Sequence, residues 1–389
     1  MISLTDAISN VLNPISDLEF IYVPLVDAFD YCLAEDIYSP IPLPPFRQSA
    51  MDGYAVSGKC NSYKVVSEIK AGDSALAIKL SFGEAVRIYT GAIVPEASIA
   101  VIQQEIVERV ENEIYVFGEI LFGMNIREKG EEISKNKLAL SKGTKLNSAA
   151  IGFLSALGIN KVKVYKKPKI AIIVTGSELA LPGDKLISGK IYESNGSTLN
   201  ACLKSLGCEK TVFYLKDNCL SIKEKLKEAI NENDLILITG GISVGEHDFV
   251  GNALKELKVQ SVFYKVKQKP GKPLFYGTKG KKKIFALPGN PAAVLSCYYI
   301  YVLPAIRLMM GNPNPELKKI RAKITQDYYK KKEKSYLLKA KLINNEVEIL
   351  PKQNSSMLSS FVNANSIVCL GEKEEVVKKG NSVDVYLLP

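Results

Sequence analysis

Histidine is nearly absent from this sequence, because His247 is the only one among 389 residues. A zinc site built on paired histidines is therefore excluded, and the seven cysteines include no C-x-x-C pair to hold zinc instead. A Ser-His-Asp triad would have to use His247, which has no nucleophile elbow beside it. The cysteines are odd in number, and we interpret them as reduced thiols of a cytoplasmic protein.

A basic start and a long apolar run are also lacking in the first residues, MISLTDAISNVL. No secretory signal is expected. One apolar stretch, residues 291–310, has the length of a membrane span. However, Asn290 and Pro291 are typical of a helix start, Arg307 interrupts the stretch, and Gly311 ends it. We therefore predict a buried core helix and no membrane association.

Positive charge is in excess, with a formal net charge of +10. This excess favours an anionic partner, which would be nucleic acid, a membrane surface or a phosphorylated small molecule. Composition alone does not choose among them. Hydrophobic residues make up 47% and charged residues 24% of the chain, which is ordinary for a soluble protein. The length predicts roughly two to four domains.

Changes of pattern along the chain predict four parts. Residues 1–35 are interpreted as helical pieces, with Ser3 or Thr5 as the first cap, and a proline-rich run at 40–45 marks a boundary. Short alternating runs with glycines then continue to about residue 140, which is typical of an antiparallel β domain. We predict a discontinuous N-terminal domain of residues 1–40 and 135–165, an inserted β domain of 41–134, an α/β domain of 166–312 and a small C-terminal β-barrel of 313–389.

The third part alternates strand and helix patterns. Its apolar runs do not alternate with polar residues, which indicates a sheet buried on both faces. The expected fold is a doubly wound α/β domain, whose ligands bind beyond the carboxyl ends of the strands. Strands are predicted at 170–176, 211–215, 234–241, 262–266, 274–277 and 284–289, with helices at 195–206, 221–230 and 248–257.

Three glycine-bearing turns are expected at that edge: Thr175–Leu179, Thr239–Asp248 and Leu287–Pro291. Glycine lets backbone N–H groups approach an anion, so three such turns together favour an anion site over plain strand–helix connections. The turns match neither the phosphate-binding P-loop pattern nor the dinucleotide fingerprint.

Carboxylates share this edge. Glu178, Asp217 and Asp248 suit a hard cation such as Mg²⁺ that bridges to phosphate oxygens. The alternative interpretation is that Asp217 and Asp248 are helix N-caps, which would account for either one alone.

Lysines follow in the segment KVKQKPGKPL. Lys265, Lys267 and Lys269 alternate, so they are predicted to face one side of a strand, and Lys272 lies beyond a Pro-Gly turn. An exposed basic strand edge is the alternative. Beside three glycine turns, anion binding is the preferred interpretation.

Further motifs lie in the predicted β domain, and together with the turns above they form an ordered set along the chain. In chain order the sequence contains PPFRQSAMDGYAV, RIYTGAIVPE, NIREKGEE, TGSEL, GGISVGEHDF, KPGKPL and LPGNP, followed by QNSSMLSSFVNANSI. Over most of its length the chain therefore resembles the molybdopterin molybdenumtransferase family (MoeA), to which the C-terminal domain of gephyrin belongs.

This resemblance implies a multidomain α/β and β protein that inserts molybdate into adenylyl-molybdopterin, with hydrolysis of the adenylate, release of AMP and a need for Mg²⁺. It implies a cytoplasmic homodimer with a cleft shared between the α/β domain of one subunit and the β domain of the other, and contact with other proteins of molybdenum cofactor biosynthesis. Catalytic roles fall on Asp52, Glu178, Asp217 and Asp248, and metal binding on Glu132, Glu178, Asp217 and Asp248. Substrate binding falls on Thr90, Arg127, Gly240, Gly241, Ser243, Lys265, Lys269, Lys272, Pro288, Gly289, Asn290, Pro291 and Ser355.

Three positions depart from the family pattern. Glu132 and Ser177 each stand where the family usually has aspartate. The usual Gly-Ser-Gly of the C-terminal motif is replaced by residues 354–356, Asn-Ser-Ser, so this loop has lost two glycines.

Three alternative functions remain open at this point. A molybdopterin adenylyltransferase shares the α/β domain but normally lacks the leading β domain and the C-terminal barrel. A non-enzymatic scaffold like gephyrin would be expected to carry a long linker, which is not visible here. Nucleic-acid binding is disfavoured, because no interleaved aromatic and basic pattern or recognition helix is found. The sequence does not decide between molybdate and tungstate.

Overall fold

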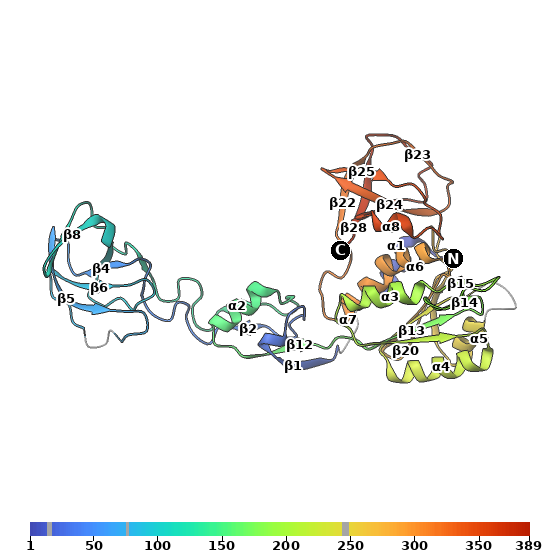
Figure 1. The fold of residues 1–389 in the computed structure, drawn as a ribbon, viewed down its shortest axis with the longest axis horizontal. Coiled ribbons are helices and arrows are strands. Elements are labelled where there is room, and N and C mark those ends of the chain that lie inside the picture. Colours follow the sequence, from blue (N-terminus) through green and yellow to red (C-terminus); the bar gives the residue numbers. More distant parts are fainter. Residues whose placement is uncertain (14–17, 75–77, 243–248) are drawn as a thin grey trace. The chain divides into compact units, whose positions relative to one another are not determined.

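The structure is a computed structural model and describes residues 1–13, 18–74, 78–242 and 249–389. Two compact units are formed (Figure 1). Unit 1 consists of Met1–Ile21, Asp30–Cys32 and Tyr165–Pro389, and unit 2 consists of Tyr22–Phe29 and Leu33–Val164.

Unit 1 contains a six-stranded sheet with the order β16-β13-β17-β21-β20-β18. The first four of these strands run parallel, and β20 and β18 are antiparallel to their neighbours. The doubly wound α/β prediction is therefore confirmed. The strands are β13 (Ile170–Thr175), β16 (Lys210–Leu215), β17 (Leu235–Thr239), β18 (Gln260–Tyr264), β20 (Phe275–Lys279) and β21 (Lys282–Leu287).

Helices cover both faces of this sheet, as its unbroken apolar strands require. On one face, Ala171 and Ile173 pack with residues of α4 (Cys219–Glu232) and α5 (Phe249–Glu256). On the other face, Ile172 and Val174 pack with residues of α1 (Leu4–Val11), α3 (Asn195–Lys204) and α6 (Pro291–Cys297). The two layers of helices lie on either side of the strands in Figure 1.

The apolar stretch after Asn290 is a helix of the core. It runs through α6, a π-helical turn (Tyr298–Val302) and α7 (Leu303–Met309). Among the described residues it is the one helix long and apolar enough to cross a membrane, and 78% of its apolar window is buried inside the protein. The predicted core helix is thus confirmed.

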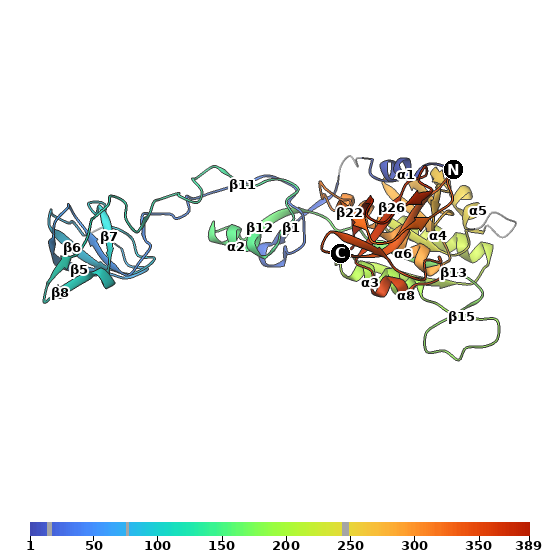
Figure 2. The ribbon, with the colours of Figure 1, turned by 90° about the horizontal axis from the view of Figure 1, so that it is seen from above.

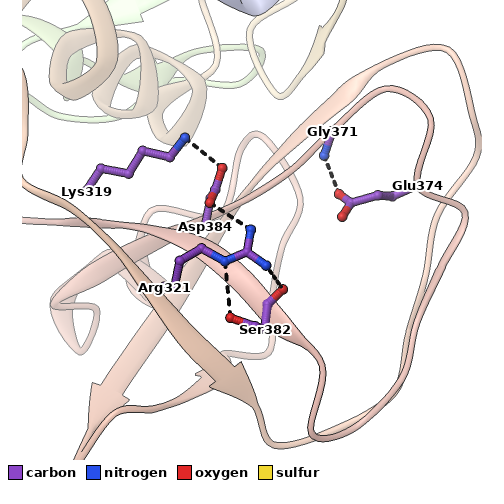
Figure 3. Close-up of polar contacts among 6 residues, drawn as sticks. All are labelled: Lys319, Arg321, Gly371, Glu374, Ser382 and Asp384. Carbon is purple, nitrogen blue, oxygen red and sulfur yellow. Dashed lines mark hydrogen bonds and ion pairs between the residues drawn. The ribbon is translucent and has the colours of Figure 1, made fainter.

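Unit 1 also contains the predicted C-terminal β-barrel. The strands pair in a ring, β24-β25-β22-β28-β26 and back to β24, around the cluster that includes Val347, Val368 and Val385. On its outer surface, Arg321 binds Asp384 at 3.1 Å and the Ser382 carbonyl at 2.6 Å, and Lys319 binds Asp384 at 2.7 Å (Figure 3). These bonds link the neighbouring strands β22 and β28 through their side chains. The strands are β22 (Lys319–Ile324), β24 (Ser335–Ile343), β25 (Glu346–Ile349), β26 (Ser366–Leu370) and β28 (Ser382–Leu387).

Unit 2 is built on a six-stranded sheet with the order β7-β4-β6-β5-β9-β8 and apolar clusters on both of its faces. β4, which lies next to the edge strand β7, begins at Gly53, where an added Cβ would lie 1.9 Å from the Ile102 carbonyl oxygen of β7. Helix α2 (Ser148–Ala156) is capped by Asn147, whose side chain accepts a hydrogen bond from the Ala150 N–H at 2.9 Å. The strands are β4 (Gly53–Val56), β5 (Ser62–Ile69), β6 (Glu84–Ile88), β7 (Ala100–Gln103), β8 (Val107–Val110) and β9 (Glu113–Val116).

Two local predictions are wrong. Among the described residues of the range 1–35 (1–13 and 18–35), helix is found only in α1, which Ser3 caps, and in a short 3-10 turn. Residues Phe20–Pro24 form the strand β1, because β-branched and aromatic residues favour a strand. Lys265 does not continue a strand, because its φ of 69° reverses the chain after β18. The expected row of three lysines on one strand face therefore does not form. The predicted division into four domains stays a prediction. It places residues 1–40 together, whereas α1 belongs to unit 1 and most of residues 22–40 belong to unit 2.

Candidate active site

Two neighbouring strand ends of unit 1 are joined through Ser177 and Asp217. The Ser177 N–H donates to Asp217 Oδ2 at 2.8 Å, and the Asp217 N–H donates to Ser177 Oγ at 3.0 Å. Asp217 is not the helix cap of the alternative interpretation, because Asn218 caps α4 through the Ser221 N–H. The carboxylate of Asp217 is instead exposed at the carboxyl edge of the sheet.

Glu178 lies in the same turn and folds back over Gly176. A Cβ added at Gly176, whose φ is 154°, would lie 2.8 Å from one oxygen of the Glu178 carboxylate. Because Gly176 has no side chain, the Glu178 carboxylate can lie directly against its backbone. The Lys190 ammonium donates to the Ser177 carbonyl, which ties the turn to the long segment between β14 (Leu179–Ala180) and β15 (Ile191–Tyr192). Figure 2 shows this segment as a loop that extends away from the sheet.

The turn after β17 packs tightly against the end of β13. Gly240 and Gly241 have φ values of 82° and 64°, and an added Cβ at Gly240 would lie 2.2 Å from the Thr175 carbonyl oxygen. Glycine is required at both positions, because the left-handed φ and the close contacts leave no room for a side chain. The predicted site residues Ser243 and Asp248 lie outside the described residues.

Asn195, at the start of α3, is bonded to the turn after β21. Its Nδ2 donates to the Gly289 carbonyl at 2.8 Å. Its Oδ1 is buried without a hydrogen-bond partner, as is the hydroxyl of Thr239. Sequence reasoning missed Asn195, although it stands at a helix start directly after a long polar loop, where a ligand-facing side chain is common.

A cavity of about 710 Å³ lies between the α/β domain and the C-terminal barrel, wholly within unit 1. Its basic side chains are Lys269, Lys272 and Lys334, and none of its described lining residues is acidic. The lining also includes Tyr328 and Tyr336. The predicted residues Lys269, Lys272, Pro288, Gly289, Asn290 and Ser355 are all brought together here.

Lys334, which lines the cavity, is a second residue that the sequence did not single out. The loop is closed by Lys330, whose buried ammonium donates to the Lys331 carbonyl at 3.3 Å and the Lys334 carbonyl at 3.0 Å. Lys265 is not among the residues that line the cavity, and its ammonium lies 4.9 Å from the centre of the Tyr264 ring.

The C-terminal loop of the cavity is held by a buried lysine. Lys339 is 2% exposed, and its ammonium donates to the carbonyl oxygens of Lys352 at 2.7 Å, Asn354 at 3.3 Å and Met357 at 3.0 Å. Burial lowers the pKa of Lys339. These bonds hold the loop although it lacks the family's two glycines.

Ser355 joins this loop to the helix after the Leu287–Pro291 turn. The Asn290 Nδ2 donates to Ser355 Oγ at 2.9 Å, and the Ala293 N–H donates to the Ser355 carbonyl at 3.1 Å. Asn290 is the N-cap of α6 but makes no capping bond with its side chain. That side chain instead ties the α/β domain to the barrel.

Unit 2 brings Asp52 and Thr90 together. The Thr90 N–H donates to Asp52 Oδ1 at 2.7 Å and the Thr90 hydroxyl donates to the same oxygen at 2.8 Å. The bond from the Thr90 N–H lowers the pKa of Asp52 most, the bond from the Thr90 hydroxyl comes next, and the charge of Arg87 adds to both.

The other two predicted residues of this unit lie on neighbouring backbone segments. Arg127 is the antiparallel strand partner of Gln48, whose side chain donates to the Gly91 carbonyl beside Thr90 at 3.1 Å. Glu132 has an exposed side chain, and its N–H donates to the Leu43 carbonyl at 3.0 Å.

Known proteins resemble this chain along its whole length. Residues 2–158 match the MoeA N-terminal region (domains I and II), residues 171–308 a probable molybdopterin binding domain, and residues 321–388 the MoeA C-terminal region (domain IV). The molybdopterin molybdenumtransferases of Staphylococcus epidermidis and Staphylococcus aureus are each 32% identical over 400 residues, which cover 99% of this chain and 95% of the relative. The chain belongs to the molybdopterin molybdenumtransferase family.

Solved structures agree with this membership. The molybdopterin biosynthesis MoeA protein from Pyrococcus horikoshii is 31% identical, with full coverage of both chains and a TM-score of 0.85. A molybdenum cofactor biosynthesis protein from Pyrococcus furiosus shares the fold at 23% identity, with a TM-score of 0.62, covering 100% of this chain and 99% of its own. The resemblance stated from the motifs is therefore confirmed, and the chain carries the domains of a molybdenum cofactor biosynthesis enzyme.

Proposed function

We propose that this protein inserts molybdenum from molybdate into adenylyl-molybdopterin. The phosphoanhydride bond to the adenylate is hydrolysed, AMP leaves, and the molybdenum cofactor is formed. Both substrates are anions, which accounts for the positive net charge of the chain. The family model for the central domain, a probable molybdopterin binding domain, and the names of the relatives support this proposal.

The cavity in unit 1 is the observation that carries it. Lys269, Lys272 and Lys334 supply positive charge to a space whose described lining has no acidic side chain. An oxyanion or phosphate held there would receive charge-assisted hydrogen bonds, which are stronger than neutral ones. Gly289 adds an open backbone position, because nothing lies within 4 Å of the place where its Cβ would be.

Glu178, in the turn after β13, and Asp217, after β16, supply negative charge at the carboxyl edge of the sheet. Carboxylate oxygens are the ligands that Mg²⁺ prefers, so the donor chemistry of these two residues fits this ion. The described residues contain no group of three acidic, cysteine or histidine side chains that would hold a metal alone, and Asp248 lies outside them. Bound Mg²⁺ would neutralise phosphate charge during the hydrolysis.

In this proposal the protein acts as a cytoplasmic homodimer. Asp52, Thr90, Arg127 and Glu132 of one subunit would then contribute to the site in the α/β domain of the other. Sedimentation at working concentration tests the dimer, and a single species of the chain mass, 42.7 kDa, would contradict it.

The proposed reaction is tested with adenylyl-molybdopterin and molybdate, with and without the protein, by following AMP. We expect release of AMP that depends on molybdate, on the protein and on added Mg²⁺. The adenylyltransferase alternative predicts instead that the protein makes adenylyl-molybdopterin from molybdopterin and ATP. A protein that binds adenylyl-molybdopterin but does not release AMP under any of these conditions would support the scaffold alternative.

A further inference from the structure

The chain's second residue is bonded to the segment that carries the cavity lysines. The Ile2 N–H donates to the Lys265 carbonyl at 3.2 Å, and the Lys267 N–H donates to the Ile2 carbonyl at 2.8 Å. Ile2 and Val266 thereby form an isolated parallel β-bridge. We call this pair of hydrogen bonds the Ile2 bridge.

The bridged segment leads directly into the cavity. The Val266 N–H donates to the Lys272 carbonyl at 3.0 Å, so the residue that Ile2 faces also holds one cavity lysine. Two residues later, Gln268 and Lys269 pair with β24 of the barrel, opposite Ser335 and Tyr336. The Ile2 bridge therefore supports one side of a short segment whose other side is fixed by the barrel.

Lys265 shows why this support matters. Its φ of 69° lies in the left-handed region, which is unfavourable for a residue with a side chain. Such a conformation persists only where the surroundings fix it. The Ile2 bridge fixes the carbonyl of this residue, and the Lys265 N–H donates to the Leu274 carbonyl at 3.0 Å on the far side of the loop.

Ile2 is itself anchored by α1. Ser3 caps this helix, and Leu4, Ala7 and Val11 are buried in the core of unit 1. At the other end of the helix, the buried Lys283 ammonium donates to the Val11 carbonyl at 3.4 Å. The position of Ile2 is thus set by a helix that packs on the sheet and not by the loop.

We propose that residues 2–11 are a positioning element of the anion cavity, in which the Ile2 bridge holds the 265–272 loop so that Lys269 and Lys272 face a bound oxyanion. This role rests on the proposed function only in the identity of the oxyanion, molybdate. Ile2 is not among the residues that line the cavity, and its effect passes through the backbone of Lys265 and Val266.

The test is the variant Ile2→Pro, which lacks the N–H that donates to Lys265 and keeps the carbonyl that accepts from Lys267. We expect molybdate, titrated by calorimetry, to bind about three- to tenfold more weakly, the effect of losing one hydrogen bond. The maximal rate of AMP release at saturating molybdate should stay near that of the unchanged protein, so the loss appears in KM and not in kcat. Ile2→Val keeps both bonds and should bind molybdate normally.

A matched control separates this role from general stability. Ile222→Val removes a buried methyl group from the opposite face of the sheet and should leave molybdate affinity unchanged. If Ile2→Pro binds molybdate as tightly as this control, the proposal is overturned.

A second measurement needs no variant. Linkage is reciprocal, so molybdate binding must stabilise the Ile2 bridge if the bridge favours molybdate. We expect the amide hydrogens of Ile2 and Lys267 to exchange more slowly at saturating molybdate, with inorganic phosphate as a second probe. Unchanged exchange with bound molybdate would overturn this role alone, whereas a protein that binds neither anion would overturn the proposed function as well.

Discussion

Ser177 and Asp217 exchange two hydrogen bonds, each donating its backbone N–H to the side chain of the other at 2.8 and 3.0 Å. The two bonds join the ends of β13 and β16, which are neighbours in the sheet. Ser177 stands where the family usually has aspartate, and its hydroxyl oxygen accepts the hydrogen bond from the Asp217 N–H.

Ser177→Asp should therefore stay active, because an aspartate oxygen also accepts the Asp217 N–H. Ser177→Ala removes the acceptor and should slow AMP release by about three- to tenfold, as expected for one lost hydrogen bond. Molybdate-dependent AMP release by both variants, measured over a range of Mg²⁺ concentrations, checks this. Equal rates for the alanine and aspartate variants would show that the pairing is not needed.

Asp217→Asn should bind adenylyl-molybdopterin at least as tightly as the unchanged protein while releasing AMP far more slowly. Asparagine keeps an oxygen for the Ser177 N–H but removes the charge that would hold Mg²⁺, so we expect a loss on the order of a hundredfold in rate. The matched control is Asp234→Asn, because Asp234 also accepts a backbone N–H, from Lys169 at 2.8 Å, but lies at the opposite edge of the sheet. A similar loss in both variants would point to folding instead of catalysis.

Lys269→Ala and Lys272→Ala should each weaken binding of adenylyl-molybdopterin about tenfold or more, because each removes a charge-assisted hydrogen bond. The loss should shrink at high salt, where the lost attraction is already screened. Lys279→Ala is the control, since Lys279 is exposed at the end of β20, away from the cavity lining. Affinities that match this control would place both lysines on a plain solvated edge.

Lys339→Met should loosen residues 352–357, because three carbonyl oxygens lose the ammonium that binds them. The loop loses three charge-assisted hydrogen bonds, so both stability and molybdate affinity should fall. Lys339→Arg, which keeps the charge and the donors, should recover part of the affinity. Chemical denaturation and molybdate titration of both variants measure this, and normal affinity in Lys339→Met would contradict the role of the loop.

Lys283 gives a pH dependence of stability. Burial lowers its pKa to about 8, whereas an unfolded lysine titrates near pH 10.4. Between these values the unfolded state binds more protons at this lysine, so the Lys283 contribution to the free energy of unfolding should rise by about 2–3 kcal/mol from pH 7 to 10. The thiols of Cys202 and Cys208, whose pKa values burial raises to about 11, act in the opposite direction within this range, and Tyr276, whose pKa burial raises to about 12, does so above it. Denaturation of the unchanged protein and of Lys283→Met at each pH checks this, since the difference between them should follow the titration of Lys283.

The sequence predicted the α/β domain well because its strands are buried on both faces. Each residue of β13 is buried, and a run of six apolar or small residues has few other ways to be satisfied in a soluble protein. The sequence placed Gly240 and Gly241 in a turn, but the need for glycine there, which is a positive φ and a close approach to Thr175, is seen only in the structure. The N-terminal region was not, because a short strand such as β1 has too few residues to show its period.

The lysines show where the pattern misled. The spacing of two residues between Lys265, Lys267 and Lys269 is typical of a strand. However, Lys265 has a left-handed φ, so the segment does not continue as a strand. This turn is stabilised by Ile2, more than 260 positions earlier in the chain, and no local rule anticipates such a partner.

The family, the α/β core and the places of the glycine turns could all be assigned from the sequence, because each depends on residues close together in the chain. Which polar side chains come into contact across the site followed only from the tertiary structure. It joined Asn290 to Ser355, set Lys334 beside Lys269 and Lys272, and gave Asn195 the Gly289 carbonyl. These contacts span tens of residues and depend on how the barrel packs against the sheet, which is a property of complementary surfaces and not of any one segment.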